Sequence, residues 1–364
     1  MAYLPLSTAN LPDPAIDPAQ GSSPADYFNT VLYPGNNSTQ SIDVGFATDF
    51  TWIKVRNVAD NHFLYDSVRG ATKYLSSDTT SAEGTIANGL TSFTSTGFNL
   101  GDSGSTNNAS NNFVAWNWKA GTSFSNDASA TSIGTVDSNG SVSTESGFSI
   151  VRFNSGASGT QSFKHGLTQR PDLCIFKEKD SGGAGDHWVV WEGVALNPAQ
   201  SYGYLNLSNS FANDASQWSN TAPTDSVFTY NSGYAWSTSQ EMIAYCFHSV
   251  EGYSKCSSYV GNNNADGPFV YTGFRPTFVI IKQTSGSNAW VMYDNAREPY
   301  NVIDLTLQPH LNSAEIDDPD QLDFVSNGFK IRANDTNARM SNASGGTYIY
   351  MAFAENPFKY SNAR

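Results

Sequence analysis

The same order of strand-forming segments occurs three times in this chain of 364 residues. The clearest copy, residues 269–282, has an aromatic run, a Gly/Pro turn and a β-branched strand, and a second strand follows it at Trp290–Asp294. Comparable segments end at Lys54, Lys177 and Lys282, which are 123 and 105 residues apart. Periods near 100 residues exceed those of solenoid repeats and match whole β-sandwich domains.

Each copy closes with a strand in which large apolar side chains alternate with smaller ones. The alternating sets are Val114, Trp116 and Trp118; Ile243, Tyr245 and Phe247; and Ile349, Met351 and Phe353. A period of two puts each set on one face of its strand. The two tryptophans would suit a platform for stacking carbohydrate, but the other copies have Ile and Met where a platform would need rings. We therefore predict a repeat core, in which burial contributes about 2–3 kcal/mol for each large side chain.

The composition favours an all-β fold. Aromatic residues make up 13% of the chain, and charged residues only 14%, against roughly 25% in an average globular protein. We predict three tandem β-sandwich repeats, jelly-roll or concanavalin-like, preceded by an extended N-terminal arm. The predicted boundaries are an arm at 1–26, repeats at 27–121, 147–252 and 253–360, and a linker at 122–146.

Two of these segments are assigned from composition alone. Residues 1–26 contain five prolines, which fix φ and remove backbone donors, so we expect an extended arm that dangles or docks onto a partner. Residues 122–146 are rich in Ser, Thr, Asn and Gly, which indicates a linker or a loosely held edge strand.

The net charge of −14 argues against binding to nucleic acid or to an anionic membrane, because both need a basic surface. The N-terminal residues lack the pattern of a secretory signal, and no run of 18 apolar residues indicates a membrane span, so we expect a protein made in a cytoplasm. Three cysteines at irregular spacing imply no disulfide framework, and Cys174 and Cys246 are expected to be buried thiols.

No catalytic residue, cofactor site or metal site is predicted. Residues 101–104, Gly-Asp-Ser-Gly, resemble a serine-protease loop but lack a matching His segment, so we expect a turn. The five histidines have no paired spacing for zinc. The acidic residues 316–323 could hold calcium, but they lack the spacing of a known loop, and a solvated turn is favoured. The 33 acidic residues also guarantee chance carboxylate pairs, so glycosidase chemistry is not excluded.

One charged motif recurs directly after the second strand of a copy. Asp66 and Arg69 have the same spacing and position as Asp294 and Arg297, whereas the second copy has Glu192 and no arginine. The pair is either a ligand clamp or an ion pair that fixes the turn. Because the motif belongs to the repeat, we predict a structural pair. Recognition is better sought in loops where the copies disagree, such as residues 180–186 and 208–224.

Several segments together resemble a known repeat family. They are residues 27–33, 66–70, 113–121, 267–276 and 342–360. In these segments the chain is similar to a repeat family of structural, tail-fibre-like virion proteins of marine tailed bacteriophages. The second copy departs most, because it lacks both the Asp-x-x-Arg and the Phe-x-x-x-Gly-Phe marks.

The resemblance implies a non-enzymatic virion protein, assembled in the host cytoplasm, most simply a tail fibre or tail appendage that contacts the host surface. It further implies other virion proteins as partners through the arm, a host surface glycan as a possible ligand, and a homo-oligomer, with a trimer favoured. Alternatives are a capsid decoration or head fibre protein, a polysaccharide-binding or polysaccharide-degrading surface protein, and a cellular adhesin or lectin.

Overall fold

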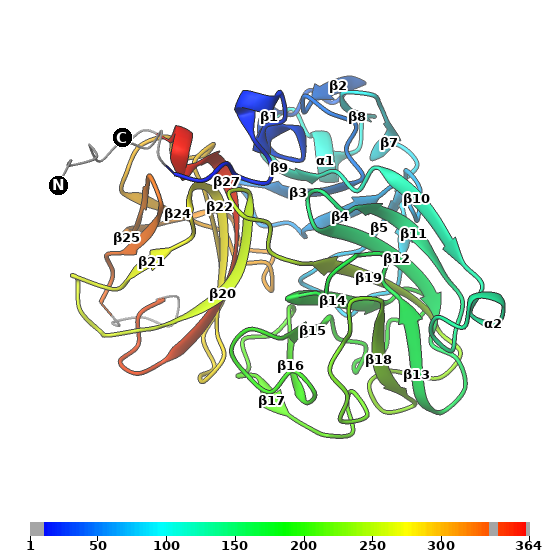
Figure 1. The fold of residues 1–364 in the computed structure, drawn as a ribbon. Coiled ribbons are helices and arrows are strands. Elements are labelled where there is room, and N and C mark those ends of the chain that lie inside the picture. Colours follow the sequence, from blue (N-terminus) through cyan, green and yellow to red (C-terminus); the bar gives the residue numbers. More distant parts are fainter. Residues whose placement is uncertain (1–10, 335–340, 362–364) are drawn as a thin grey trace.

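The computed structural model describes residues 11–334 and 341–361. Strands dominate the described part (Figure 1), and its α-helices, α1 (Gly104–Asn107) and α2 (Ala128–Thr131), are a single turn each. The all-β class predicted from composition is therefore confirmed. The strands fall into three consecutive units, which we call the first unit (27–121), the second unit (122–252) and the third unit (253–360).

The first unit pairs a sheet of order β1-β9-β3-β4 with a sheet of order β2-β8-β7. A short hairpin of β5 and β6 lies beside them. The bounds are β1 (Phe28–Pro34), β2 (Gln40–Asp43), β3 (Phe50–Val55), β4 (Phe63–Asp66), β5 (Lys73–Tyr74), β6 (Gly84–Thr85), β7 (Leu90–Phe93), β8 (Gly97–Leu100) and β9 (Asn112–Trp118). Both sheets contribute to one apolar cluster, in which Ile53 and Phe113 lie with Ile42 and Phe98.

The second unit has a sheet of order β10-β11-β12-β19-β14-β15-β16-β17 and a two-stranded sheet of β13 and β18. The bounds are β10 (Thr122–Asn126), β11 (Ser138–Ser143), β12 (Phe148–Asn154), β13 (Gly159–Lys164), β14 (Leu173–Glu178), β15 (Val189–Glu192), β16 (Ser201–Tyr204), β17 (Ala212–Asn213), β18 (Val227–Ser232) and β19 (Glu241–Phe247). The linker predicted at 122–146 was wrong: β11 pairs with β12 over six residues, and β10 pairs with β11. Its small polar side chains suit an edge strand, the alternative that composition left open.

The third unit has sheets of order β20-β27-β22-β23 and β21-β26-β25-β24. The bounds are β20 (Ser254–Val260), β21 (Phe269–Tyr271), β22 (Phe274–Gln283), β23 (Trp290–Asp294), β24 (Ile303–Thr306), β25 (Ile316–Val325), β26 (Gly328–Ile331) and β27 (Thr347–Pro357). The solvated turn predicted at 316–323 was wrong, because this segment lies in β25 and Asp318 is buried. Pairing of β25 with β24 and β26 outweighs the turn tendency of its acidic residues.

The closing strand occupies the same place in each unit. β9 lies between β1 and β3, β19 between β12 and β14, and β27 between β20 and β22. Each closing strand is also covered on both of its faces, which explains why it has few polar residues. One face packs inside its own unit, as Phe113 and Ala115 do in the first. The other face carries the alternating set of large side chains.

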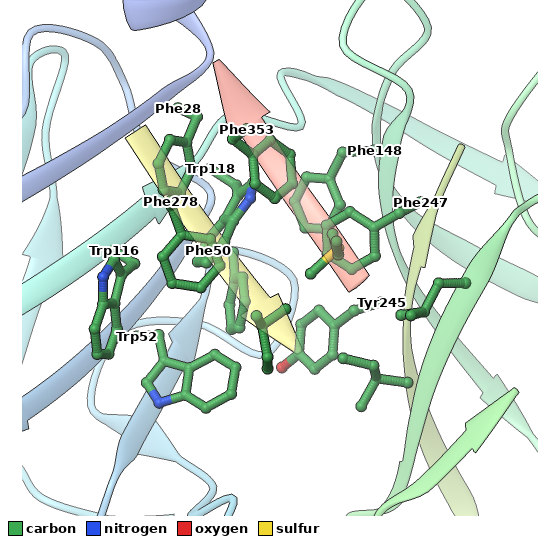
Figure 2. Packing of buried hydrophobic residues seen from close by; sticks show 14 of the residues in the cluster. Phe28, Phe50, Trp52, Trp116, Trp118, Phe148, Tyr245, Phe247, Phe278 and Phe353 are labelled. Atoms are coloured by element: carbon green, nitrogen blue, oxygen red, sulfur yellow. The ribbon is translucent and has the colours of Figure 1, made fainter. Parts of the chain in front are cut away.

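These alternating sets meet in one core that the three units share (Figure 2). The predicted core residues Trp116, Trp118, Tyr245, Phe247, Met351 and Phe353 are all buried and belong to a single cluster. Phe353 of the third unit stacks on Phe28 of the first with ring centroids 4.8 Å apart, and Phe50 stacks on Tyr245 of the second at 4.4 Å. The position of this core corrects the sequence-based interpretation: it lies between the units and not inside each sandwich.

The same backbone hydrogen bond closes each of the three contacts between units. The N–H donors and carbonyl acceptors are Glu83 and Lys179 at 2.7 Å, Phe211 and Thr284 at 2.9 Å, and Glu315 and Arg56 at 2.7 Å. Each acceptor lies two residues after the lysine that marks its copy. The first unit thus contacts the second, the second contacts the third, and the third contacts the first. The repeats therefore form a closed ring.

The marker lysines hold the same contacts. Lys54, Lys177 and Lys282 are buried, and their ammonium groups donate to Asn312 O at 3.3 Å, Thr80 O at 3.1 Å and Ser208 O at 3.0 Å, respectively. Each also donates to the carbonyl of the next residue in its own strand. Burial lowers the pKa of these lysines, to about 8 for the first two and about 7 for the third. The lysine that recurs at the end of this strand in each copy therefore makes a contact between neighbouring units.

The described part of the N-terminal arm packs on its own chain. Ile16 is buried in the shared core, and Ala15 N donates to Glu251 O at 3.3 Å. The Tyr360 hydroxyl donates to Asp17 at 2.6 Å, which joins the arm to the C-terminal η4 (Phe358–Tyr360). Two short 3₁₀ turns, η2 (Pro18–Gln20) and η3 (Pro24–Asp26), replace the extended conformation expected for the whole segment. Residues 1–10 of the predicted arm lie outside the described residues.

A shared core predicts that the three units unfold together. Ile243 lies in that core and is fully buried, so Ile243→Val should lower the free energy of unfolding by about 0.5–1.5 kcal/mol. Differential scanning calorimetry should show one transition for the wild type, and the variant should move this transition as a whole. A separate early transition of the second unit alone would contradict the shared core.

Candidate functional site

The Asp-x-x-Arg motif forms a buried ion pair in both units that have it. Arg69 Nε lies 2.5 Å from Asp66 Oδ2, and Arg297 Nε lies 2.6 Å from Asp294 Oδ2. Each arginine also donates to a carbonyl of the preceding strand, Arg69 to Leu64 at 2.8 Å. Burial opposes the charge of each guanidinium, but the paired carboxylate raises the arginine pKa above its usual value. The side chains of both pairs are at most 1% exposed, which excludes a clamp for a ligand from solvent.

Each of these carboxylates also accepts a hydrogen bond from the closing strand of a neighbouring unit. The Tyr245 hydroxyl of the second unit donates to Asp66 Oδ2 at 2.7 Å. Trp116 Nε1 of the first unit donates to Asp294 Oδ2 at 3.0 Å. Trp116 is therefore neither a stacking platform nor a purely apolar core residue, because its indole N–H fastens the first unit to the third.

The contact between the third unit and the second explains why the second unit lacks the arginine. The position equivalent to Trp116 and Tyr245 is Met351 in the third unit, which has no N–H or O–H to donate. The carboxylate of the second unit, Glu192, instead accepts from the backbone N–H groups of Val194, Ala195 and Leu196 at 2.8–3.1 Å. An Asp-Arg pair is therefore present where the neighbouring unit supplies a side-chain donor, and absent where the neighbouring unit has Met351. The second unit lacks the arginine because its carboxylate is satisfied by backbone N–H groups, and not because a ligand site has been lost.

The second unit contains a cavity of about 300 Å³. It lies between the end of β14, the loop before β15, the turn after β18 and the start of β19. Its lining includes Glu178, Asp186, His187, Tyr234 and Trp236. This volume is at the lower end of the range usual for small-molecule sites, roughly 300–1,000 Å³.

Two of the residues that line this cavity each have a buried polar atom, with almost no accessible surface, that lacks a hydrogen-bond partner within the described part of the chain. The two atoms are Oε2 of Glu178 and Nε1 of Trp236. The other oxygen, Oε1 of Glu178, accepts from Ser237 N at 2.6 Å, which orients the carboxylate. Burial raises the pKa of Glu178. Both residues are more than nine-tenths buried.

The wall of the cavity is aromatic and apolar. Trp236 packs against Phe176 with ring centroids 5.1 Å apart, and Met242 lies beside them. Tyr234 is 53% exposed, and its hydroxyl donates to Asp214, which holds the ring at the cavity. His187 accepts from Asn206 at Nδ1, so its proton is on Nε2, and burial lowers its pKa.

The sequence singled out part of this site. The loop at 180–186 borders the cavity and was selected because the copies disagree there, but Glu178 and Trp236 were not predicted. The available signal was that residues directly after the marker lysines differ: Val55, Glu178 and Gln283. The loop at 208–224 contributes Phe211 to the shared core and Trp218 to the core of the second unit, so part of it is structural.

The other candidate chemistry gives no site. Ser103, in the protease-like motif, is the residue before the short helix α1, and its carbonyl accepts from Asn107 N. Across residues 11–334 and 341–361, no three His, Cys, Asp or Glu side chains group so that they could hold a metal ion. The cysteines are buried free thiols, and burial raises the pKa of Cys174 and Cys256. No helix in the described residues is long and apolar enough to cross a membrane.

The architecture defines an all-β protein whose three related units form a ring around one core. In comparison with known families, residues 23–357 match "Domain of unknown function (DUF7483)". The match covers most of the chain, so the chain belongs to this family. Neither a curated protein nor a solved structure matches the chain.

Proposed function

We propose that the protein is a non-enzymatic structural protein of a tailed-bacteriophage virion, a tail fibre or tail-associated appendage that contacts the host surface. The observation that carries the proposal is that the residues that recur in the repeat serve to hold its units together. The marker lysines and the two Asp-Arg pairs all fasten one unit to the next, which suits a rigid body. The resemblance of the repeat to tail-fibre-like virion proteins supplies the assignment to a virion.

Immunogold labelling of intact particles tests this proposal. Label at the tail is the expected result, with the protein added to the particle in the host cytoplasm. Label on the capsid would favour a decoration or head fibre protein. Absence of label from purified virions would contradict a virion role, and a cellular adhesin or lectin would then be the better hypothesis.

The partners and the oligomeric state belong to the same proposal. We expect attachment to other virion proteins through the N-terminal arm and a homotrimer in solution. Sedimentation velocity of the purified chain measures its mass directly against the 39.3 kDa of one copy. A monomer at micromolar concentration would contradict the trimer without contradicting a virion role.

A second candidate function is binding or degradation of a surface polysaccharide, and the cavity of the second unit favours its binding form. Degradation is tested by incubating the protein with host envelope glycans and measuring released oligosaccharide. We expect no release.

A further inference from the structure

One edge strand has the same place in all three units. β2, β13 and β21 each follow a strand that pairs with the closing strand, and each lies at the edge of the second sheet of its unit. One buried residue of each pairs with a phenylalanine, which makes these residues equivalent: Ile42 with Phe98, Phe163 with Phe228 and Val270 with Phe329. The residues on either side direct their backbone N–H and C=O groups away from the sheet, because these groups alternate along an antiparallel strand.

In the second unit this edge is covered by the stretch that leads into β11. The carbonyl of Ser162, the residue before Phe163, accepts from Thr135 N at 2.7 Å, and its N–H donates to Thr135 Oγ1 at 2.8 Å. The carbonyl of Lys164, on the other side, accepts from Ser138 Oγ at 2.9 Å. The outward backbone groups of this edge strand are therefore able to hold a further segment of chain.

In the third unit the same edge is bare and aromatic. The residues on either side of Val270 are Phe269 and Tyr271, which are 49% and 54% exposed. Within the described residues, no segment pairs with the outer edge of β21. The first unit has Ser41 and Asp43 at these positions, and polar side chains of this kind are usual on an edge that faces water. Two exposed rings instead indicate an edge that a partner covers.

A groove of about 370 Å³ adjoins the end of β21. Its lining is mostly apolar and includes Tyr271, Phe358 of η4, and Pro12 and Pro14 of the N-terminal arm. Lys255 of β20 also lines it, with its ammonium 3.2 Å from Tyr271 O and 5.3 Å from the centre of the Tyr271 ring. The arm, the bare edge and a cation thus lie at one place on the surface.

The charges of this groove favour an acidic occupant. Lys359 in the lining pairs with Asp13, whereas Lys255 pairs with no carboxylate of the described residues. Burial lowers the pKa of Lys255, so a carboxylate placed beside it would replace interactions that the ammonium has lost with water. The lining contains one acidic residue, Glu251, which is exposed. A second copy of this chain fits less well, because each copy has a net charge of −14.

We propose that β21 and the adjoining groove are a docking site for an extended segment of another protein, in which apolar side chains alternate and a carboxylate lies near one end. The backbone of the segment pairs with Phe269, as an added strand does at a free sheet edge. Its apolar side chains cover the rings of Phe269 and Tyr271, and its carboxylate contacts the Lys255 ammonium. The inference deepens the proposed function, and it rests on that function for the source of the segment, another virion protein that the arm also contacts.

Selection of random heptapeptides from a displayed library on the purified full chain tests the proposal. Enriched peptides are synthesised with a fluorescent label, and their dissociation constants are measured by fluorescence polarisation. We expect apolar residues at alternate positions and at least one carboxylate. Phe269→Ser combined with Tyr271→Asp gives β21 the exposed residues of β2, so the variant should fold, and it should weaken binding about tenfold or more. Lys255→Gln should weaken acidic peptides about threefold or more.

The matched control is Tyr300→Ser, which removes a ring that is 74% exposed outside this site and should stay within about twofold of the wild type. Enrichment of no peptide, or of basic peptides, or equal binding by the double variant, would overturn the proposal. A dimer in sedimentation velocity that the double variant abolishes would overturn it in favour of a second copy. If the double variant does not fold, Phe269→Ser alone and Lys255→Gln decide the result. Peptide binding by a protein absent from virions would contradict the proposed function and leave the docking site standing.

Discussion

Replacing Arg297 with methionine is expected to lower the free energy of unfolding by about 3–5 kcal/mol. The variant leaves the carboxylate of Asp294 buried without its guanidinium partner, 2.6 Å away in the wild type. It also removes donors to Met292 O at 3.0 Å and to Glu315 at 2.9 Å. Because Asp294 accepts from Trp116 of the first unit, the loss should also weaken the contact between units. Chemical denaturation followed by tryptophan fluorescence measures the effect.

Arg152→Met is the matched control. Arg152 pairs with Glu241 at 2.9 Å, but these side chains are 43% and 30% exposed, so solvent already screens the pair. An exposed ion pair contributes about 0–1 kcal/mol, and we expect a loss within that range. Equal losses of unfolding free energy in Arg297→Met and Arg152→Met would show that burial does not strengthen the contribution of the Asp-Arg pair to stability.

A double variant separates the buried charge from the packing of the arginine. Asp294→Asn combined with Arg297→Met leaves no unpaired charge, and the asparagine oxygen still accepts from Trp116. It should recover part of the stability lost in Arg297→Met, because removing both charges avoids the cost of one buried alone. A double variant less stable than Arg297→Met would contradict this account.

The sequence predicted what depends on local pattern. The alternation at Trp116 and Trp118 identified buried positions, and the spacing of Lys54, Lys177 and Lys282 identified equivalent places. The alternation could not show what covers that face, because period two fixes only that one side is apolar. The structure shows that the cover comes from other copies of the repeat, through contacts between residues far apart in the sequence, such as Phe50 with Tyr245.

The candidate site was less accessible to sequence reasoning for a related reason. Disagreement among the copies indicated the loop at 180–186, since a loop freed from the repeat can diverge. The unpaired state of Glu178 and Trp236 depends on what their atoms fail to contact in three dimensions. Residues 58 positions apart in sequence give no pattern for such an absence. Similarly, the composition of 122–146 could not distinguish a linker from an edge strand, because both favour small polar side chains.

Acidification from pH 7 to pH 5 is expected to lower the free energy of unfolding by several kcal/mol. Burial lowers the pKa of His165 and of His310 to about 4, and that of His62 well below its usual value. The nearby ammonium groups of Lys282 and Lys54 lower the pKa of His310 and His62 further. The folded protein therefore keeps these imidazoles neutral where the unfolded chain protonates them.

Hydrogen bonding explains why two of these rings resist protonation. Nδ1 of His62 accepts from Trp52 Nε1 at 2.9 Å, so its Nε2 carries the proton and donates to Gln308 O of the third unit. Nδ1 of His165 accepts from Leu167 N at 3.2 Å in the same way. A second proton on Nδ1 would point at an N–H donor. Protonation therefore requires that the ring move, and in His62 this would break a contact between units.

The sign and size of this change in unfolding free energy follow from protonation of the histidines in the folded and in the unfolded state. Above the unfolded pKa of about 6.5 both states are neutral and these histidines make no difference. Below it the unfolded chain binds more protons, so stability falls until pH reaches the folded pKa of about 4. Each histidine with a folded pKa near 4 removes about 2 kcal/mol at pH 5. Asp78 opposes this, because burial raises its pKa to about 6 and the folded state binds its proton first, restoring about 1 kcal/mol.

His165→Gln tests the contribution of one of these histidines. Glutamine can still donate to Thr224 O, which His165 Nε2 contacts at 3.2 Å, but it does not titrate. The difference in unfolding free energy between pH 7 and pH 5 should shrink by about 2 kcal/mol relative to the wild type, whatever the variant costs at pH 7. The same substitution at the less buried His187 should change that difference by less. If His165→Gln loses as much stability on acidification as the wild type, protonation of buried histidine does not drive the acid transition.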